Sequence, residues 1–143
     1  MNDIKFKIVI MTHSTLCDGF LDASKLILGS KCEEVEVLPF EQNMSTQSLE
    51  NQLEKLIEGT RPSPLLILTD LIGGTPNNIA MKFIEEPNIE VVSGINLPFL
   101  IEILMNQESG IYLNNIPLSD ITTSSQESLI YINDMLEKRG SND

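Results

Sequence analysis

Two short stretches that contain only apolar residues constrain the fold more than any other feature of the sequence. They are Ile8–Met11 near the N-terminus and Leu65–Leu68 near the middle of the chain. A strand that is apolar at every position is buried on both faces, as in parallel sheets covered by helices. We therefore predict a first strand over roughly residues 5–11 and a central strand over 65–68.

Helical and strand patterns alternate along the rest of the chain. The stretch 34–40 alternates acidic and apolar residues and contains Pro39, which places it near a sheet edge. Ser45 is the expected N-cap of a second helix, and Gly29 follows the end of the first. We predict helices at 17–28, 45–57, 77–85 and 98–105, a fourth strand at 89–93, and a short helix from 117 to 126. This order predicts an α/β fold: a single open, mainly parallel sheet of four strands with helices on both faces.

Length and charge restrict the classes of protein further. The chain has 143 residues, which fits a single domain over 1–143, with a frayed tail over 139–143. Its formal charge of −12 argues against binding to nucleic acid or to an anionic membrane surface. No apolar run is long enough to span a membrane, and the N-terminus lacks a signal-peptide pattern. We expect a cytoplasmic protein without direct membrane insertion.

The two cysteines, Cys17 and Cys32, are 15 residues apart and have no CxxC spacing. No second histidine accompanies them, because His13 is the only one in the chain. We therefore expect reduced, buried thiols and no metal site.

Polar residues follow three of the predicted strands. The first strand leads into Thr12, His13 and Ser14, the third into Asp70, and the fourth into Gly94 and Asn96. In open α/β folds the carboxyl ends of parallel strands lie at one edge, where ligands bind. We expect His13 and Asp70 to be catalytic there, with the site shaped by Thr12, Ser14, Gly73, Gly74, Thr75 and Asn96.

A histidine beside an aspartate can act as a nucleophile. A carboxylate that accepts a hydrogen bond from Nδ1–H fixes the tautomer and leaves a lone pair on Nε2. No activated Ser or Cys is evident as a third member. If His13 itself is the nucleophile, the natural electrophile is a phosphoryl group. Thr75 is the expected N-cap of the next helix, with Pro76 at its first position, so backbone N–H groups there would attract an anion.

Other interpretations of these residues remain open. The pair Gly73-Gly74 completes neither GxGxxG nor GxxxxGK[ST], and alone it is typical of a tight turn. A flavodoxin-like module that binds a flavin or nucleotide phosphate at the same edge is a second hypothesis. The scarcity of aromatic residues, 5% of the chain, argues against it because few rings are present to stack on such a ligand.

Three motifs together resemble a known family. They are Thr12-His13, the Asp-x-x-Gly-Gly-Thr-Pro-x-Asn of 70–78, and the Gly-Ile-Asn-Leu-Pro of 94–98. The sequence resembles the IIA component of the mannose-type sugar phosphotransferase system. The resemblance implies that His13 takes a phosphoryl group from the phosphohistidine of HPr and passes it to a histidine of a IIB component, for sugar uptake. It also implies that Asp70 orients His13, that Thr75 and nearby amides stabilise the phosphoryl group, and that no metal or cofactor is needed.

The resemblance also implies a homodimer in which a C-terminal strand pairs antiparallel on the partner's sheet. Our candidate strand is 129–133, although the residues alone leave open a helix continuing to 138. Family members often have glycine after the histidine, where this chain has Ser14. We expect IIB to be a separate protein. The same site could instead serve a dihydroxyacetone kinase phosphorelay or regulation.

Overall fold

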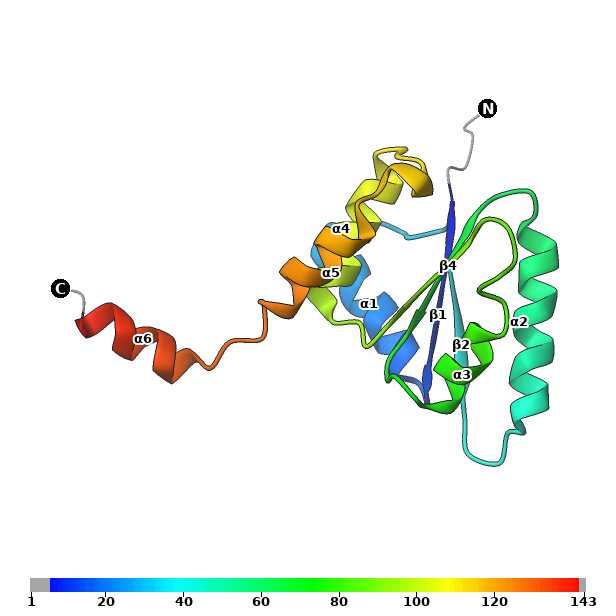
Figure 1. The fold of residues 1–143 in the computed structure, drawn as a ribbon, viewed down its shortest axis with the longest axis horizontal. Coiled ribbons are helices and arrows are strands. Elements are labelled where there is room, and N and C mark those ends of the chain that lie inside the picture. Colours follow the sequence, from blue (N-terminus) through cyan, green and yellow to red (C-terminus); the bar gives the residue numbers. More distant parts are fainter. Residues whose placement is uncertain (1–5, 142–143) are drawn as a thin grey trace.

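The computed structural model describes residues 6–141, and this part of the chain contains one four-stranded sheet. All strand pairs are parallel, in the order β2-β1-β3-β4 (Figure 1). The predicted open parallel sheet is confirmed, with β2 at an edge and the two apolar strands in the centre. The strands are β1 (Lys7–His13), β2 (Val35–Phe40), β3 (Leu65–Thr69) and β4 (Ile89–Ser93).

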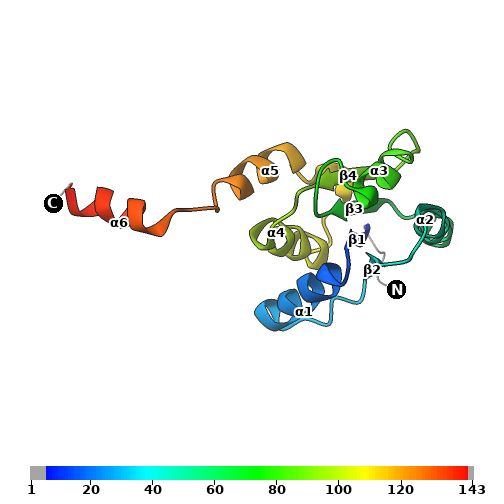
Figure 2. The same ribbon diagram turned by 90° about the horizontal axis from the view of Figure 1, so that it is seen from below.

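Helices cover both faces of the sheet, as the alternating pattern predicts. In Figures 1 and 2, α2 and α3 lie on one side, and α1 and α4, with α5 packed on α4, lie on the other. The helices are α1 (Leu16–Leu28), α2 (Thr46–Thr60), α3 (Thr75–Met81), α4 (Leu97–Glu108), α5 (Leu118–Gln126) and α6 (Ile132–Ser141), with a 3₁₀ turn at Leu113–Asn115.

The side chains of β1 alternate between two separate apolar cores. Ile8 and Ile10 pack toward α4, whereas Val9 and Met11 pack toward α2. All four are fully buried. Burial of one such side chain stabilises the fold by about 1.5–3 kcal/mol, so the wholly apolar run is needed to fill both cores at once.

Several element ends differ from the prediction. Helices α2 and α4 each continue three residues beyond the predicted ends at 57 and 105. Strand β1 reaches His13, two residues beyond the predicted end, because His13 stays in register with Phe40 of β2. The predicted start at residue 5 lies outside the described residues. Helix α3 ends at Met81 instead of residue 85. Beyond it, the amides of Lys82 and Phe83 donate to carbonyls three residues back, as in tighter 3₁₀-type turns.

The C-terminal part matches neither predicted alternative in full. Residues 129–131 form neither helix nor strand, and the helix α6 begins at Ile132. The predicted strand is therefore wrong at 132 and 133, and its exchange between subunits stays a prediction. In Figures 1 and 2, α6 projects away from the sheet and its covering helices. It continues through Ser141, so 139–141 are helical where we predicted a frayed tail, and 142–143 lie outside the described residues.

No helix in residues 6–141 is both long and apolar enough to cross a bilayer.

Candidate functional site

The sheet register places Asp70 beside His13. Met11 of β1 pairs with Thr69 at the end of β3, so the chain leaving β3 passes the last residues of β1. The backbone N–H of His13 donates to Oδ2 of Asp70 at 3.0 Å. The ring atom Nδ1 of His13 lies 3.1 Å from Oδ2 and 3.3 Å from Oδ1 of the same carboxylate. One side chain thus holds both the backbone and the ring of the histidine.

This geometry selects the ring tautomer of His13. An ionised carboxylate can only accept hydrogen bonds, so Nδ1 carries the hydrogen, and in the neutral ring Nε2 then keeps its lone pair. The side chain of His13 is 45% exposed, whereas that of Asp70 is 12% exposed. The atom Nε2, our candidate nucleophile, therefore belongs to an accessible ring, and the carboxylate at Nδ1 is shielded from water.

Gly74 lies directly against the other side of the imidazole. A Cβ at residue 74 would stand 2.6 Å from Cε1 and 3.2 Å from Nε2 of His13. Its neighbour Gly73 has φ +84°, a conformation that strongly favours glycine. Asn78, the last residue of the 70–78 motif, donates from Nδ2 to the carbonyl of Gly73 at 3.2 Å. The two glycines are thus required for different reasons, Gly73 for the turn and Gly74 for the close approach.

Phe40 at the end of β2 is a site residue that our sequence reasoning missed. Its ring meets that of His13 edge-on, with centroids 6.4 Å apart, and its carbonyl accepts the N–H of Ser14 at 2.8 Å. Ser14 has φ +52°, in the left-handed region. This explains why glycine suits the position after the histidine: the chain turns sharply there to enter α1. The sequence pattern of β2 indicates an edge strand but does not place its last residue beside His13.

Thr12 shapes the turn after β1 from inside the protein. Its side chain is fully buried, and Oγ1 accepts the N–H of Cys17 at 2.8 Å and donates to the carbonyl of Ser14 at 3.2 Å. Thr12 therefore ties the start of α1 to the end of β1. Direct contact between Thr12 and a phosphoryl group stays a prediction.

The structure assigns different local roles to Thr75 and Asn96 from those we expected. Gly74, not Thr75, is the N-cap of α3, and Thr75 is the first helical residue. Asn96 caps α4 by accepting the N–H of Phe99 at 2.9 Å, and its Nδ2 donates to the carbonyl of Ser125 at 2.8 Å. The side-chain oxygen of Asn96 is thus bonded to α4 and its nitrogen to α5.

Cys17 and Cys32 are free and buried. Burial raises the pKa of the Cys17 thiol above its ordinary value, and the hydrogen bond to Thr12 partly opposes that shift. Among the described residues no cluster of three or more His, Cys, Asp or Glu side chains could hold a metal ion.

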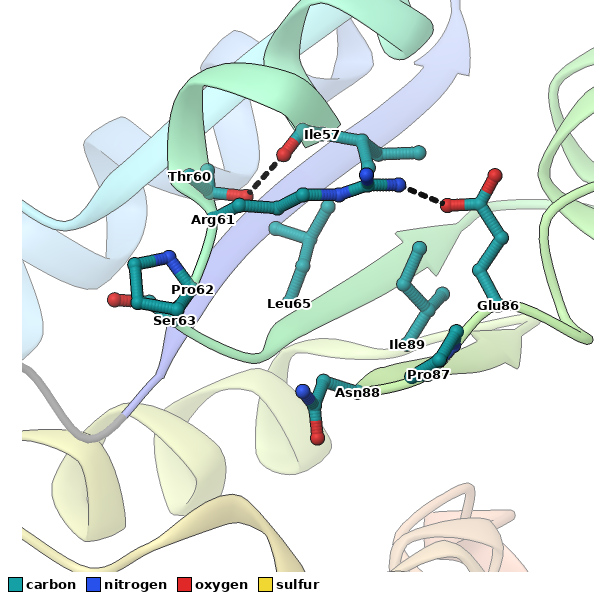
Figure 3. Close-up of a pocket in the computed structure, with 10 residues that line it drawn as sticks. All are labelled: Ile57, Thr60, Arg61, Pro62, Ser63, Leu65, Glu86, Pro87, Asn88 and Ile89. Carbon is teal, nitrogen blue, oxygen red and sulfur yellow. Dashed lines mark hydrogen bonds and ion pairs between the residues drawn. The ribbon is translucent and has the colours of Figure 1, made fainter.

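A cavity of about 340 Å³ lies at the opposite end of the sheet (Figure 3). It is lined by the start of β3 at Leu65 and the start of β4 at Ile89. Arg61 and Glu86 face each other at its rim, with Nη2 of the former 2.8 Å from Oε2 of the latter. Because His13 sits at the carboxyl end of β1, this cavity is not part of its site.

Comparison with known proteins identifies the family. The family described as "PTS system fructose IIA component" matches residues 7–114, where PTS denotes the phosphotransferase system. This chain belongs to that family. The match includes His13, Asp70 and the whole 70–78 motif, and it supports the predicted mannose-type IIA component of a sugar-transporting phosphotransferase system.

Individual relatives agree with this assignment. The fructose-specific EIIA component of Bacillus subtilis is 29% identical over 133 residues, which are 92% of this chain and 89% of that protein. A solved EIIA component from Streptococcus agalactiae is 31% identical, with a TM-score of 0.78 over 90% of this chain and 98% of that one. A PTS IIA protein associated with the fucose utilization operon of Streptococcus pneumoniae has a TM-score of 0.83 at 26% identity, over 95% and 99% of the two chains.

Proposed function

We propose that this chain is a phosphocarrier whose His13 receives a phosphoryl group from phospho-HPr and delivers it to a IIB component. The observation that carries the proposal is the double contact between Asp70 and His13, in which one carboxylate meets the backbone N–H and Nδ1. In the proposed step the Nε2 lone pair of His13 attacks phosphorus. The N–P bond of the donor phosphohistidine breaks, and the donor imidazole leaves with the bonding electrons.

The charges around the ring support this step. As Nε2 bonds to phosphorus, positive charge develops on the imidazole, and the carboxylate of Asp70 at Nδ1 stabilises it. Phosphoryl transfer of this kind depends mainly on positioning and electrostatics, which the fixed ring supplies. By family resemblance, the hydroxyl of Thr75 and the amides near Gly73 and Gly74 would hold the phosphoryl oxygens. No metal or cofactor enters the proposed step.

Labelling with radioactive phosphoenolpyruvate tests the proposal. Incubation with enzyme I, HPr and labelled phosphoenolpyruvate should give an acid-labile phosphoryl group on the wild-type protein and none on the His13→Ala variant. Omitting HPr should abolish labelling, which controls for direct transfer from enzyme I. A folded wild-type protein that never becomes labelled would exclude the proposed function.

The acceptor distinguishes the remaining alternatives. Loss of label on addition of a IIB component supports the sugar-transport role, for which the relatives' names argue. Loss of label only to a dihydroxyacetone kinase would instead support a phosphorelay. The family match argues against a flavodoxin-like module. A rise in melting temperature on adding a flavin or nucleotide would instead support it.

We further propose that residues 1–143 form one IIA domain that pairs with a second copy through the segment 129–131. Leu129 and Tyr131 are 90% and 74% exposed, and the sheet has open edges at β2 and β4. Exposed apolar residues and open strand edges favour association. Light scattering should give about twice the 15.9 kDa of one chain, and the double variant Leu129→Asp/Tyr131→Asp should be monomeric. A monomeric wild type would contradict the pairing.

A further inference from the structure

A small buried polar cluster lies directly behind the loop that carries Asp70. Its centre is Thr69, the last residue of β3, whose side chain is fully buried. Oγ1 of Thr69 lies 2.8 Å from Oγ of Ser93 at the end of β4. The same oxygen lies 3.4 Å from Oδ1 of Asn77, which is 3% exposed in the first half of α3. One hydroxyl thus joins two strands and a helix.

Both contacts of Thr69 can be hydrogen bonds at the same time. A hydroxyl has one hydrogen to donate and can also accept. If Ser93 donates to Thr69, then Thr69 can donate to Asn77, whose Nδ2 in turn donates to Sδ of Met81 at 3.5 Å. No buried side-chain nitrogen or oxygen in the described residues lacks a partner, so the cluster is satisfied.

The backbone of Thr69 is part of the same junction. Its carbonyl accepts the N–H groups of Gly94 and Ile95, at 2.9 and 3.2 Å, so the turn after β4 is fixed to the end of β3. Asp70 follows directly, and the loop from 71 to 74 leads from there to α3 and Asn77. Both ends of this loop are therefore joined through one side chain, that of Thr69.

A buried polar cluster needs an explanation because apolar side chains would fill the same space without desolvation cost. Burying an amide or hydroxyl costs free energy that a hydrogen bond only recovers, so such clusters contribute geometry more than stability. Here the geometry concerns the two residues that contact the ring of His13, namely Asp70 at Nδ1 and Gly74 at Cε1 and Nε2. Both lie on the loop that the cluster holds.

We propose that Thr69 and Asn77 are positioning residues for phosphoryl transfer: their buried contact fixes the loop that sets Asp70 and Gly74 against His13. Neither side chain touches the reacting atoms. They act by setting where the loop begins and where it ends. This inference rests on the proposed function, since it concerns the same site.

The variants Thr69→Val and Asn77→Leu test the inference, because each removes the polar contact at similar volume. We expect initial labelling by phospho-HPr to slow about tenfold in each, because a displacement of about 1 Å in a reacting geometry can cost about 100-fold. The loss should appear in kcat more than in KM. Thr69→Ser, which keeps the hydroxyl, should restore most of the rate.

Thr60→Val is the matched control. Thr60 is 8% exposed, and its hydroxyl donates to the carbonyl of Ile57 at the opposite end of the sheet. This substitution removes the same hydroxyl from a similar environment far from His13 along the strands. It should leave the labelling rate within about twofold of wild type, even if it lowers the melting temperature as much as Thr69→Val and Asn77→Leu do.

A measurement independent of phosphorylation tests the positioning role of Thr69 and Asn77 separately from the proposed phosphocarrier function. The ¹⁵N chemical shifts of the His13 ring report which nitrogen carries the hydrogen, and they should move in Thr69→Val and Asn77→Leu but not in Thr60→Val. Wild-type protein that is never labelled would overturn the proposed function, whereas unchanged ring shifts overturn the positioning role by themselves. Variants that unfold are replaced by Asn77→Ala and Thr69→Ala, judged by the same ring shifts. A loss of stability with wild-type labelling and ring shifts would show that the cluster is only structural.

Discussion

Gly74 and His13 approach each other so closely that residue 74 cannot carry a side chain without displacing the imidazole. The ring therefore lies between a carboxylate that meets Nδ1 and a bare backbone near Nε2. The position of the His13 ring thus depends on the hydrogen bond to Asp70 and on the lack of a Cβ at residue 74.

Gly74→Ala should abolish phosphoryl transfer. The new Cβ would lie 2.6 Å from Cε1 of His13 and 3.2 Å from the carbonyl of Leu71, so the ring must move off Asp70. We expect labelling to fall by at least about 100-fold and stability by about 1–3 kcal/mol. Gly59→Ala is the control, because nothing lies within 4 Å of its Cβ in α2, and it should stabilise by about 0.5–1 kcal/mol with normal labelling. Normal labelling of Gly74→Ala would show that the ring position does not matter.

Asp70→Asn should slow transfer without unfolding the protein. The amide keeps the shape of the carboxylate but loses the charge that stabilises the imidazole as Nε2 reacts. Hydrogen bonds to charged groups contribute about 1.5–3 kcal/mol, so we expect labelling to slow by about 10- to 100-fold. Asp120→Asn, at an exposed position in the first turn of α5, should label at the wild-type rate. Equal rates for both variants would remove Asp70 from the mechanism.

Substitutions at Ser14 should separate backbone strain from catalysis. Because φ is +52° there, Ser14→Gly relieves strain but increases the freedom of the unfolded chain, and these effects nearly cancel. Ser14→Val places a β-branched residue in the left-handed region and should cost about 1–3 kcal/mol. Urea unfolding measures both. A Ser14→Val protein as stable as wild type would contradict the strain at this position.

The buried thiol of Cys17 should make stability depend on pH in the alkaline range. Its pKa is raised in the folded protein, chiefly by burial, above the ordinary value of 9.0. Below that pH the thiol is neutral in both states. As pH rises through it, only the unfolded chain ionises, so the stability falls. Melting temperatures from pH 7 to 10.5 should therefore drop more steeply for wild type than for Cys17→Ala, and identical slopes would contradict this.

The parts of the site that could be predicted from sequence are those set by local pattern. Apolar runs that end in polar residues located the ends of β1 and β3, and parallel strands necessarily bring those ends to one edge. His13 and Asp70 were found in this way because each directly follows a run of buried residues. Phe40 was missed because nothing local marks the last residue of an edge strand as a neighbour of the histidine.

Burial periodicity and turn residues act over a few positions, so the sequence alone indicates the alternation of strands and helices, the parallel sheet and the candidate residues for carrying a phosphoryl group. Three features became clear from the folded chain alone: β1 extends to His13, the side chains of Thr12 and Asn96 accept hydrogen bonds from the first turns of α1 and α4, and Thr69 joins β3 to β4 and α3. The register of β1 with β2 and the contact of Thr69 with Ser93 join segments far apart in the chain. The partners of Thr12 and Asn96 are only five and three residues away, but they depend on how the chain turns after each strand. Residues 129–131 show the same limit, because their β-prone pattern finds no strand partner within one copy of the described chain.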